Sequence, residues 1–86
     1  MFAGEEETVT LLCENDMIGV VIDRFGHEVN VRKADDMHFR ARLHVAVSGQ
    51  FYGWLCGLGE KVEIIEPAEM REKYVTYLQK IQNKYS

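Results

Sequence analysis

The residues of this chain best suited to chemistry are cationic side chains that alternate with apolar ones between His38 and Val47. A period of two over that length predicts a β-strand whose two sides face opposite directions. The apolar side should face the core and the cationic side should face away from it. Because guanidinium groups suit carboxylate and phosphate groups, the pattern indicates a contact surface for anions. The cationic side consists of His38, Arg40, Arg42 and His44.

Neighbouring strands should extend this surface. The segment from Glu28 to Lys33 reads as a strand that adds Arg32 and Asn30, and the segment from Glu7 to Cys13 adds two threonines. Glu63, on a fourth strand, should neutralise part of the charge. The alternative is an open antiparallel sheet face that meets only solvent. Aromatic side chains are missing from these outward positions, which disfavours sequence-specific RNA reading. The residues assigned to a ligand or interdomain contact are Arg32, Arg40, Arg42 and His44.

Three glycines recur every fourth residue near an expected helix from Gln50 to Leu58. A glycine inside a helix costs about 0.5–1 kcal/mol relative to alanine, and close approach of another backbone is the usual compensation. That approach has two explanations: packing against another helix of the same monomer, or contact with a dimer mate or another domain. The residues assigned to the second explanation, as an oligomer contact, are Tyr52, Gly53 and Cys56.

Metal binding, cofactor binding and catalysis are not expected. His38 and His44 would stand about 20 Å apart on one strand, too far to share an ion. The chain has no CxxC pair and no serine or cysteine with a recognisable base partner. The glycines lie within and at the end of an aromatic helix, so they do not form a phosphate-binding loop.

Composition indicates one small globular domain over residues 1–86. The net charge of −4 argues against non-specific duplex binding by this chain alone. Two cysteines without a secretion signal indicate reduced thiols and a cytoplasmic protein. No apolar stretch approaches the length of about 20 residues that spans a bilayer.

The order of expected elements is βαββαβα, which predicts an α+β fold: a ferredoxin-like βαββαβ sandwich with an additional C-terminal helix. Right-handed crossovers would put the first and third strands in the centre. Asn15 is expected to cap a helix that Gly26 ends, and Gly59 to end the second helix. Pro67 is expected at the first position of the last helix, which runs to about Lys84. That helix would cover the helical layer, cover a sheet edge, or project toward another domain.

One segment is distinctive in its order and spacing: GWLCGLGEKVEIIEPAEMREKY. It joins a tryptophan–leucine helix, a leucine–glycine stop, a valine-rich strand and a glutamate–proline helix start. In these features, and in Arg24-Phe25-Gly26, the chain resembles the C-terminal extension (WCX) domain of bacterial WYL-domain transcription regulators. In such regulators a DNA-binding helix-turn-helix and a central WYL domain accompany the extension. Neither of these is expected within residues 1–86.

The resemblance implies a non-catalytic regulatory domain that contributes to dimerisation and to effector response. Its implied partners are the WYL domain of the parent protein or its dimer mate, with a homodimer and a small anionic or nucleic-acid effector as further partners. Two alternatives stay open: a free-standing ferredoxin-like sensor of a small molecule or anion, and an oligomerisation module without a ligand.

Overall fold

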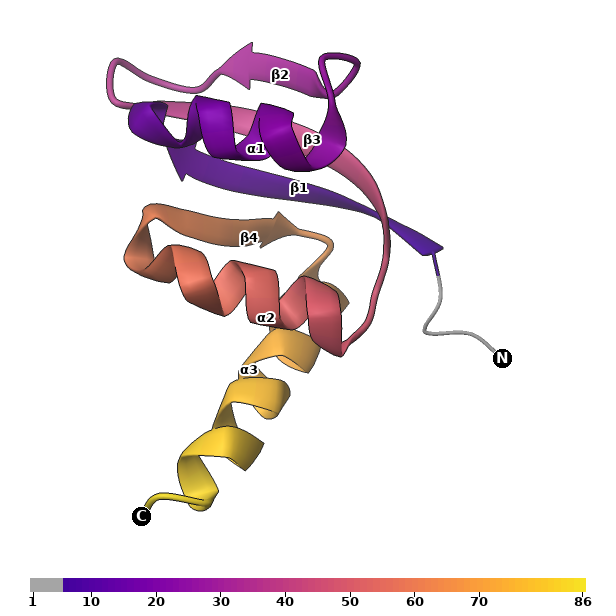
Figure 1. The fold of residues 1–86 in the computed structure, drawn as a ribbon, viewed down its shortest axis with the longest axis vertical. Helices are drawn as coiled ribbons and strands as arrows, with labels where there is room; N and C mark the ends of the chain where they lie inside the picture. Colours follow the sequence, from indigo (N-terminus) through magenta and orange to yellow (C-terminus); the bar gives the residue numbers. More distant parts are fainter. Residues whose placement is uncertain (1–5) are drawn as a thin grey trace.

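The computed structural model describes residues 6–86, so residues 1–5 of the expected domain lie outside the described part. Three helices accompany four strands (Figure 1). The strands are β1 (Glu6–Glu14), β2 (Asn30–Lys33), β3 (His38–Ala46) and β4 (Val62–Glu66). The helices are α1 (Ile18–Phe25), α2 (Gly49–Leu58) and α3 (Ala68–Asn83), and short 3-10 turns span Asn15–Met17 and Gly59–Lys61.

The four strands form one antiparallel sheet in the order β2-β3-β1-β4. The two long strands, β1 and β3, are therefore the inner ones, and they pair along their whole length from Glu6 opposite Ala46 to Glu14 opposite His38. Helices α1 and α2 lie on the same side of the sheet (Figure 1). This α+β arrangement is compatible with the predicted ferredoxin-like fold. The β2 strand is shorter than expected, because pairing begins only at Asn30.

The core lies between the sheet and the helices. Alternate residues of β1 and β3 are buried, and their neighbours in sequence face outward, as the period of two predicts. Between α1 and α2, Phe25 meets Trp54 edge to face at a centroid distance of 5.2 Å. The buried residues are Val9, Leu11, Cys13, Val21, Phe39, Ala41, Leu43, Val45, Phe51, Leu55, Ile64 and Met70.

The two cysteines have different surroundings. Cys13 is fully buried on the inner face of β1, and that burial raises the pKa of its thiol to about 11. The thiol therefore stays protonated at neutral pH and acts as a small apolar core group. Cys56 is exposed on α2, and both cysteines are free.

Two predicted helix starts are wrong. The side chain of Asn15 caps no helix, because its Nδ2 donates to the carbonyl oxygen of Asp36 at 2.9 Å, across the β2–β3 turn. Pro67 stands one residue before α3 with extended backbone (φ −77°, ψ 163°), at the cap position and not inside the helix. The predicted helix ends are correct: Gly26 and Gly59 have φ values of 86° and 65°, which side chains other than glycine rarely adopt.

Helix α2 begins at a cap that the sequence analysis did not assign. Ser48 has extended backbone, and its side-chain oxygen accepts a hydrogen bond from the amide of Phe51 at 3.4 Å. A serine in this position satisfies one of the free amides of the first turn. At this cap α2 begins, with two residues separating it from the end of β3, and the helix buries Phe51 and Leu55.

Of the three positions considered for the C-terminal helix, the structure shows the one at a sheet edge. The first turn of α3 packs beside β4, a sheet edge, with Met70 buried. The rest of the helix then projects away from the body of the domain (Figure 1). Arg71 secures the start of the helix, since its Nη1 donates to the Ile64 carbonyl at 2.8 Å and to Glu63 Oε2 at 3.1 Å.

Candidate contact surface on the open face of the sheet

The side of the sheet opposite α1 and α2 carries the predicted cationic residues. Arg40 stands between Leu12 of β1 and Arg32 of β2 in the strand register, and Arg42 stands between Thr10 and Asn30. All three arginines are exposed. The strand register therefore brings together Arg32, Arg40 and Arg42, which we call the arginine face.

The positive charge of the arginine face is not neutralised within the described part of the chain. Arg32 and Arg40 are direct cross-strand partners, and like charges in that position are destabilising. Among residues 6–86, no ion pair involves any of the three arginines. The fold thus holds like charges together without pairing them, although Glu28 and Glu66 line the two hollows beside Arg42.

Glu63 does not provide the expected neutralisation. It faces outward on β4, opposite Leu12, but its carboxylate pairs with Arg71 of α3. The sequence pattern placed Glu63 on the correct side of the sheet. It gave no sign that Arg71, eight residues later on the helix, would reach back to the strand.

His44 is the fourth residue assigned to the contact, and it lies on the same side of β3, beyond Arg42. Its Nε2 donates to Glu6 Oε1 at 2.9 Å, and its Nδ1 lies 3.4 Å from Thr8 Oγ1. Both partners are on β1, and the side chains of His44 and Glu6 are largely exposed. His44 therefore belongs to the same surface but already has a carboxylate partner.

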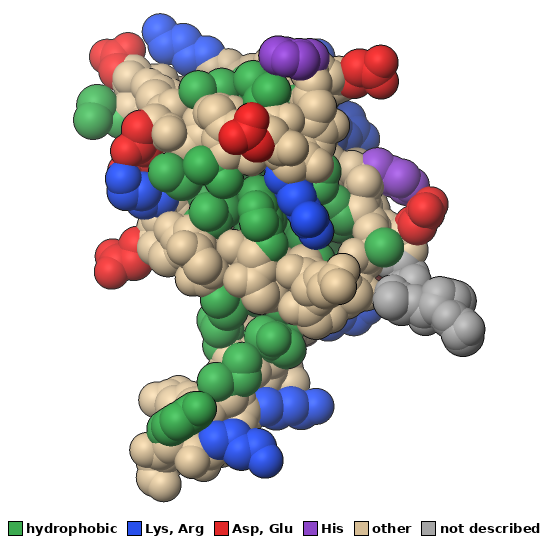
Figure 2. Space-filling model, viewed as in Figure 1, with side chains coloured by type: hydrophobic (Ala, Val, Ile, Leu, Met, Phe, Trp, Pro, Cys, Tyr) green, Lys and Arg blue, Asp and Glu red, His purple; other side chains and the backbone are tan. Residues whose placement is uncertain are grey.

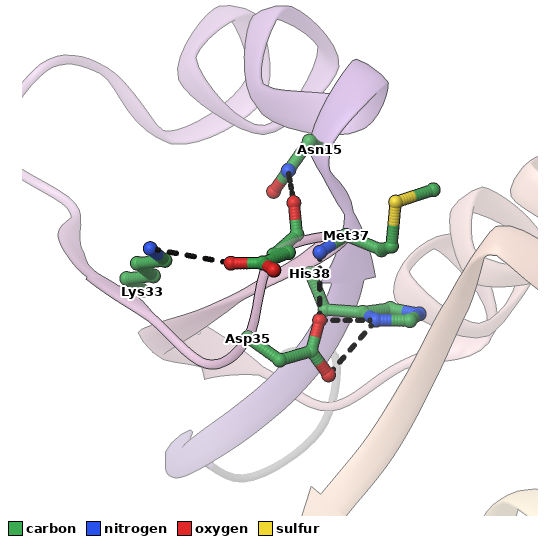
Figure 3. Close-up of polar contacts among 6 residues, drawn as sticks. Asn15, Lys33, Asp35, Met37 and His38 are labelled. Atoms are coloured by element: carbon green, nitrogen blue, oxygen red, sulfur yellow. Dashed lines mark hydrogen bonds and ion pairs between the residues drawn. The ribbon is translucent and has the colours of Figure 1, made fainter.

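His38, at the start of β3, takes part in the β2–β3 turn (Figure 3). Its Nδ1 donates to Asp35 Oδ1 at 2.9 Å, and the same oxygen accepts from the amide of Met37 at 2.8 Å. The hydrogen bond from His38, followed by that from Met37, lowers the pKa of the Asp35 carboxyl group below its ordinary value. The ionised carboxylate of Asp35 stabilises the folded turn. This stabilisation is fully present above the pKa that Asp35 has in the unfolded chain, and it is lost as the pH falls through the lower pKa of the folded chain.

Two surface hollows meet at Arg42. The first has a volume of about 410 Å³ and lies beside the start of β2, where Phe25 and Val29 add apolar surface to Arg42 and His44. The second has a volume of about 520 Å³ and runs from Arg42 across Thr10 to the start of α3. Arg42 is thus the one cationic residue that lines both hollows, next to hydroxyl groups from Thr8 and Thr10.

The residues assigned to an oligomer contact lie in two different settings. A methyl group built on Gly53 would meet no atom within 4 Å, and the same holds at Gly49 and Gly57. The explanation by tight packing within the monomer is therefore wrong. Gly53 is exposed, so its assignment to a contact with another molecule stays a prediction.

Tyr52 and Cys56 turn toward α3. The ring of Tyr52 lies 5.6 Å from that of Tyr74 and 4.7 Å from that of Tyr77, between centroids. The Tyr74 hydroxyl donates to Cys56 Sγ at 3.4 Å. The pKa values of Tyr52 and Tyr74 are both raised, mainly because burial disfavours the charged phenolate. These side chains join α3 to α2, a role that the sequence analysis missed because the relative position of two helices is not encoded in either periodicity alone.

Metal binding finds no support in the described residues, where no three histidine, cysteine, aspartate or glutamate side chains come together. Within residues 6–86, no helix has the length and apolar character needed to cross a bilayer.

Comparison with protein families decides the relationship. The WCX domain family matches residues 5–82, nearly the whole chain. The chain belongs to the WCX domain family. WCX domains are regulatory domains of WYL-type transcription regulators, and the family is not known as catalytic. The comparisons with curated proteins and with solved structures gave no match.

Proposed function

We propose that this WCX domain is the non-catalytic, ferredoxin-like regulatory domain of a bacterial WYL-family regulator, contributing to dimerisation and effector response. The arginine face, with His44 beside it, is the surface that docks on acidic groups of the parent protein's WYL domain. The observation that carries this proposal is the set of exposed arginines without an ion-pair partner among residues 6–86. Guanidinium groups form strong, often bidentate hydrogen bonds to carboxylates, so an acidic neighbour would relieve their mutual repulsion.

The proposed mechanism is a shift between two docked states. An effector that binds one arrangement of the WCX and WYL domains more tightly than the other moves the equilibrium by that difference in affinity. The movement repositions the DNA-binding heads elsewhere in the parent regulator. We expect no direct binding of duplex DNA by this domain, because its net charge is −4.

The hollows beside Arg42 favour a second candidate, a sensor of small anions. Arg42 and two threonine hydroxyls line the larger hollow, and these groups suit phosphate or carboxylate oxygens. Glu66 lines the same hollow, so an anion would have to bind on the side of Arg42 and the threonines. Inorganic phosphate serves as the probe. A rise in the melting temperature of the 86-residue chain with added phosphate, absent for Arg42→Glu, would favour this candidate over docking on a domain.

Reversing two charges of the arginine face tests docking in the parent regulator. Arg40→Glu with Arg42→Glu should weaken the effector-dependent change in DNA affinity at least tenfold, since each charge-assisted hydrogen bond contributes about 1.5–3 kcal/mol. The measurement is DNA binding with and without effector, by fluorescence anisotropy.

A matched control makes the same change in net charge elsewhere. Arg24 on α1 and Lys33 at the end of β2 lie outside the arginine face. Arg24→Glu with Lys33→Glu should leave the effector response intact. An unchanged effector response together with unchanged assembly in the Arg40 and Arg42 variant would contradict the docking proposal.

A further inference from the structure

Helix α3 presents a regular apolar edge beyond the body of the domain. Tyr74, Leu78 and Ile81 of α3, and Tyr85 in the turn that follows it, stand at intervals of four, three and four residues, the spacing that lines the seam of a coiled coil. We call these four residues the α3 seam. Figure 2 shows hydrophobic side chains continuing down this helix after it leaves the body of the domain.

Most of the α3 seam is uncovered. Met70 is the only buried residue of α3, and Tyr74 and Tyr77 are half-buried against Tyr52. Further along, Leu78 is 39% exposed, Ile81 42% and Tyr85 87%. Short helices in water are marginal without packing on an apolar face. The projecting turns of α3 therefore present the kind of surface that another helix covers.

Charge divides the C-terminal third of the chain into two parts. Residues 73–86 contain three lysines, Lys73, Lys80 and Lys84, and no acidic residue. Residues 60–72 contain five glutamates, at every third position, against one lysine and one arginine. Those two cations are already paired, Lys61 with Asp16 and Arg71 with Glu63. An acidic part, which spans β4 and the start of α3, is thus followed along the chain by a basic part, which lies on the projecting turns.

A groove lies at the junction of these two parts. It has a volume of about 310 Å³ and runs between β4, an edge strand, and the first half of α3. Val62, Ile64 and Val75 give it an apolar lining. Of its two glutamates, Glu63 is paired with Arg71, which also lines the groove, and Glu60 has no ion-pair partner among residues 6–86. Val75 is itself half exposed on α3, so the groove continues into the uncovered side of the helix.

We propose that a second copy of this chain covers the α3 seam, with the two α3 helices antiparallel. In this arrangement Leu78 of one copy lies level with Ile81 of the other, and Tyr74 lies level with Tyr85. The lysine-bearing end of each helix then reaches the groove of its partner. This inference rests on the proposed function and names the surface through which dimerisation occurs.

A second copy fits better than an unrelated partner because the helix is complementary to itself. In this register Lys84 of one copy lies level with Val75 of the other, at the groove that contains Glu60, and twofold symmetry makes this contact twice. It also places opposite ends of the two helix dipoles together. A parallel pair in register would instead place Lys84 beside the same residue of the other copy and away from the groove.

Sedimentation equilibrium of the 86-residue chain tests the pairing. The unaltered chain should dimerise with a dissociation constant that rises with salt, because charge contributes to the contact. Leu78→Glu with Ile81→Glu should weaken dimerisation at least 100-fold and leave the β-sheet signal in circular dichroism unchanged. The control, Thr76→Glu with Gln79→Glu, adds the same charge to α3 outside the seam and should still dimerise.

Charge reversal tests the antiparallel orientation. Lys84→Glu should weaken the dimer, and addition of Glu60→Lys in the same chain should restore it, because Lys84 of one copy is expected to reach Glu60 of the other. Two results would overturn the proposal. In the first, the unaltered chain stays monomeric at 100-fold the protein concentration used for the parent regulator's DNA binding. In the second, the seam variant and its control dimerise equally. These outcomes are independent of the arginine-face variants, whose failure would affect docking alone.

Discussion

Replacement of Leu11 by alanine is expected to lower the free energy of unfolding by about 2–5 kcal/mol, the cost of emptying a well-packed core position. Leu11 is fully buried on β1, an inner strand of the sheet, where it lies opposite Ala41 of β3 and Ile64 of β4. Three strands therefore lose a contact at once. Because a domain is stable by only about 5–15 kcal/mol in total, the variant should unfold at a much lower urea concentration.

Leu12→Ala is the matched control for this prediction. Leu12 is the next residue of the same strand, but it is half-buried and faces the open side of the sheet. Its replacement should cost about 1 kcal/mol or less, in the range of substitutions outside the core. Urea unfolding followed by circular dichroism gives both values. Equal losses for Leu11→Ala and Leu12→Ala would mean that the two sides of β1 have been assigned wrongly.

Replacement of Met70 by alanine is expected to release α3 from the sheet edge. Met70 is the one fully buried residue of that helix, and emptying such a site costs about 2–5 kcal/mol. The remaining links, from Arg71 to the strand and from Tyr74 to α2, lie at or near the surface. Hydrogen exchange of the amides in the first half of α3 should therefore accelerate more than exchange in β1 and β3.

Met37→Ala provides the comparison with an exposed methionine. Met37 is 69% exposed in the β2–β3 turn, so its replacement should leave the exchange of α3 unchanged. If Met70→Ala accelerates exchange equally in α3 and in the central strands, the helix unfolds only together with the whole domain. That result would contradict the description of α3 as an element anchored at a single buried residue.

The sheet could be predicted from the sequence because its signal is local and repeated. From Phe39 onward, apolar and charged residues alternate along β3, and one face of a half-buried strand needs that alternation. The same logic placed Arg32, Arg40 and Arg42 on one side of the sheet. The glycines at positions 26 and 59 marked helix ends because only glycine readily takes a positive φ.

Features that depend on distant partners were missed. Asn15 is a residue type that often caps helices, but its side-chain amide donates a hydrogen bond to a carbonyl oxygen of the β2–β3 turn instead. Glu63 pairs with Arg71 instead of the sheet arginines, since α3 passes beside β4. The sequence shows that a glycine at position 53 lowers the stability of the helix, but only the structure shows that the space beside it is open. The contact of α3 with the sheet edge was one of three expectations, and the periodicity of the helix could not choose among them.

Arginine-selective labelling tests the central claim, that the arginine face is a docking surface in the parent regulator. The chain has five arginines, so Arg24 and Arg71 serve as internal references for Arg32, Arg40 and Arg42. Phenylglyoxal modification, read by mass spectrometry, should be several-fold slower at the arginine face in the full-length regulator than in the 86-residue chain. The rate at Arg24 should stay the same in both. Equal rates at Arg32, Arg40 and Arg42 in the two proteins would contradict the account, because the face would then meet only solvent.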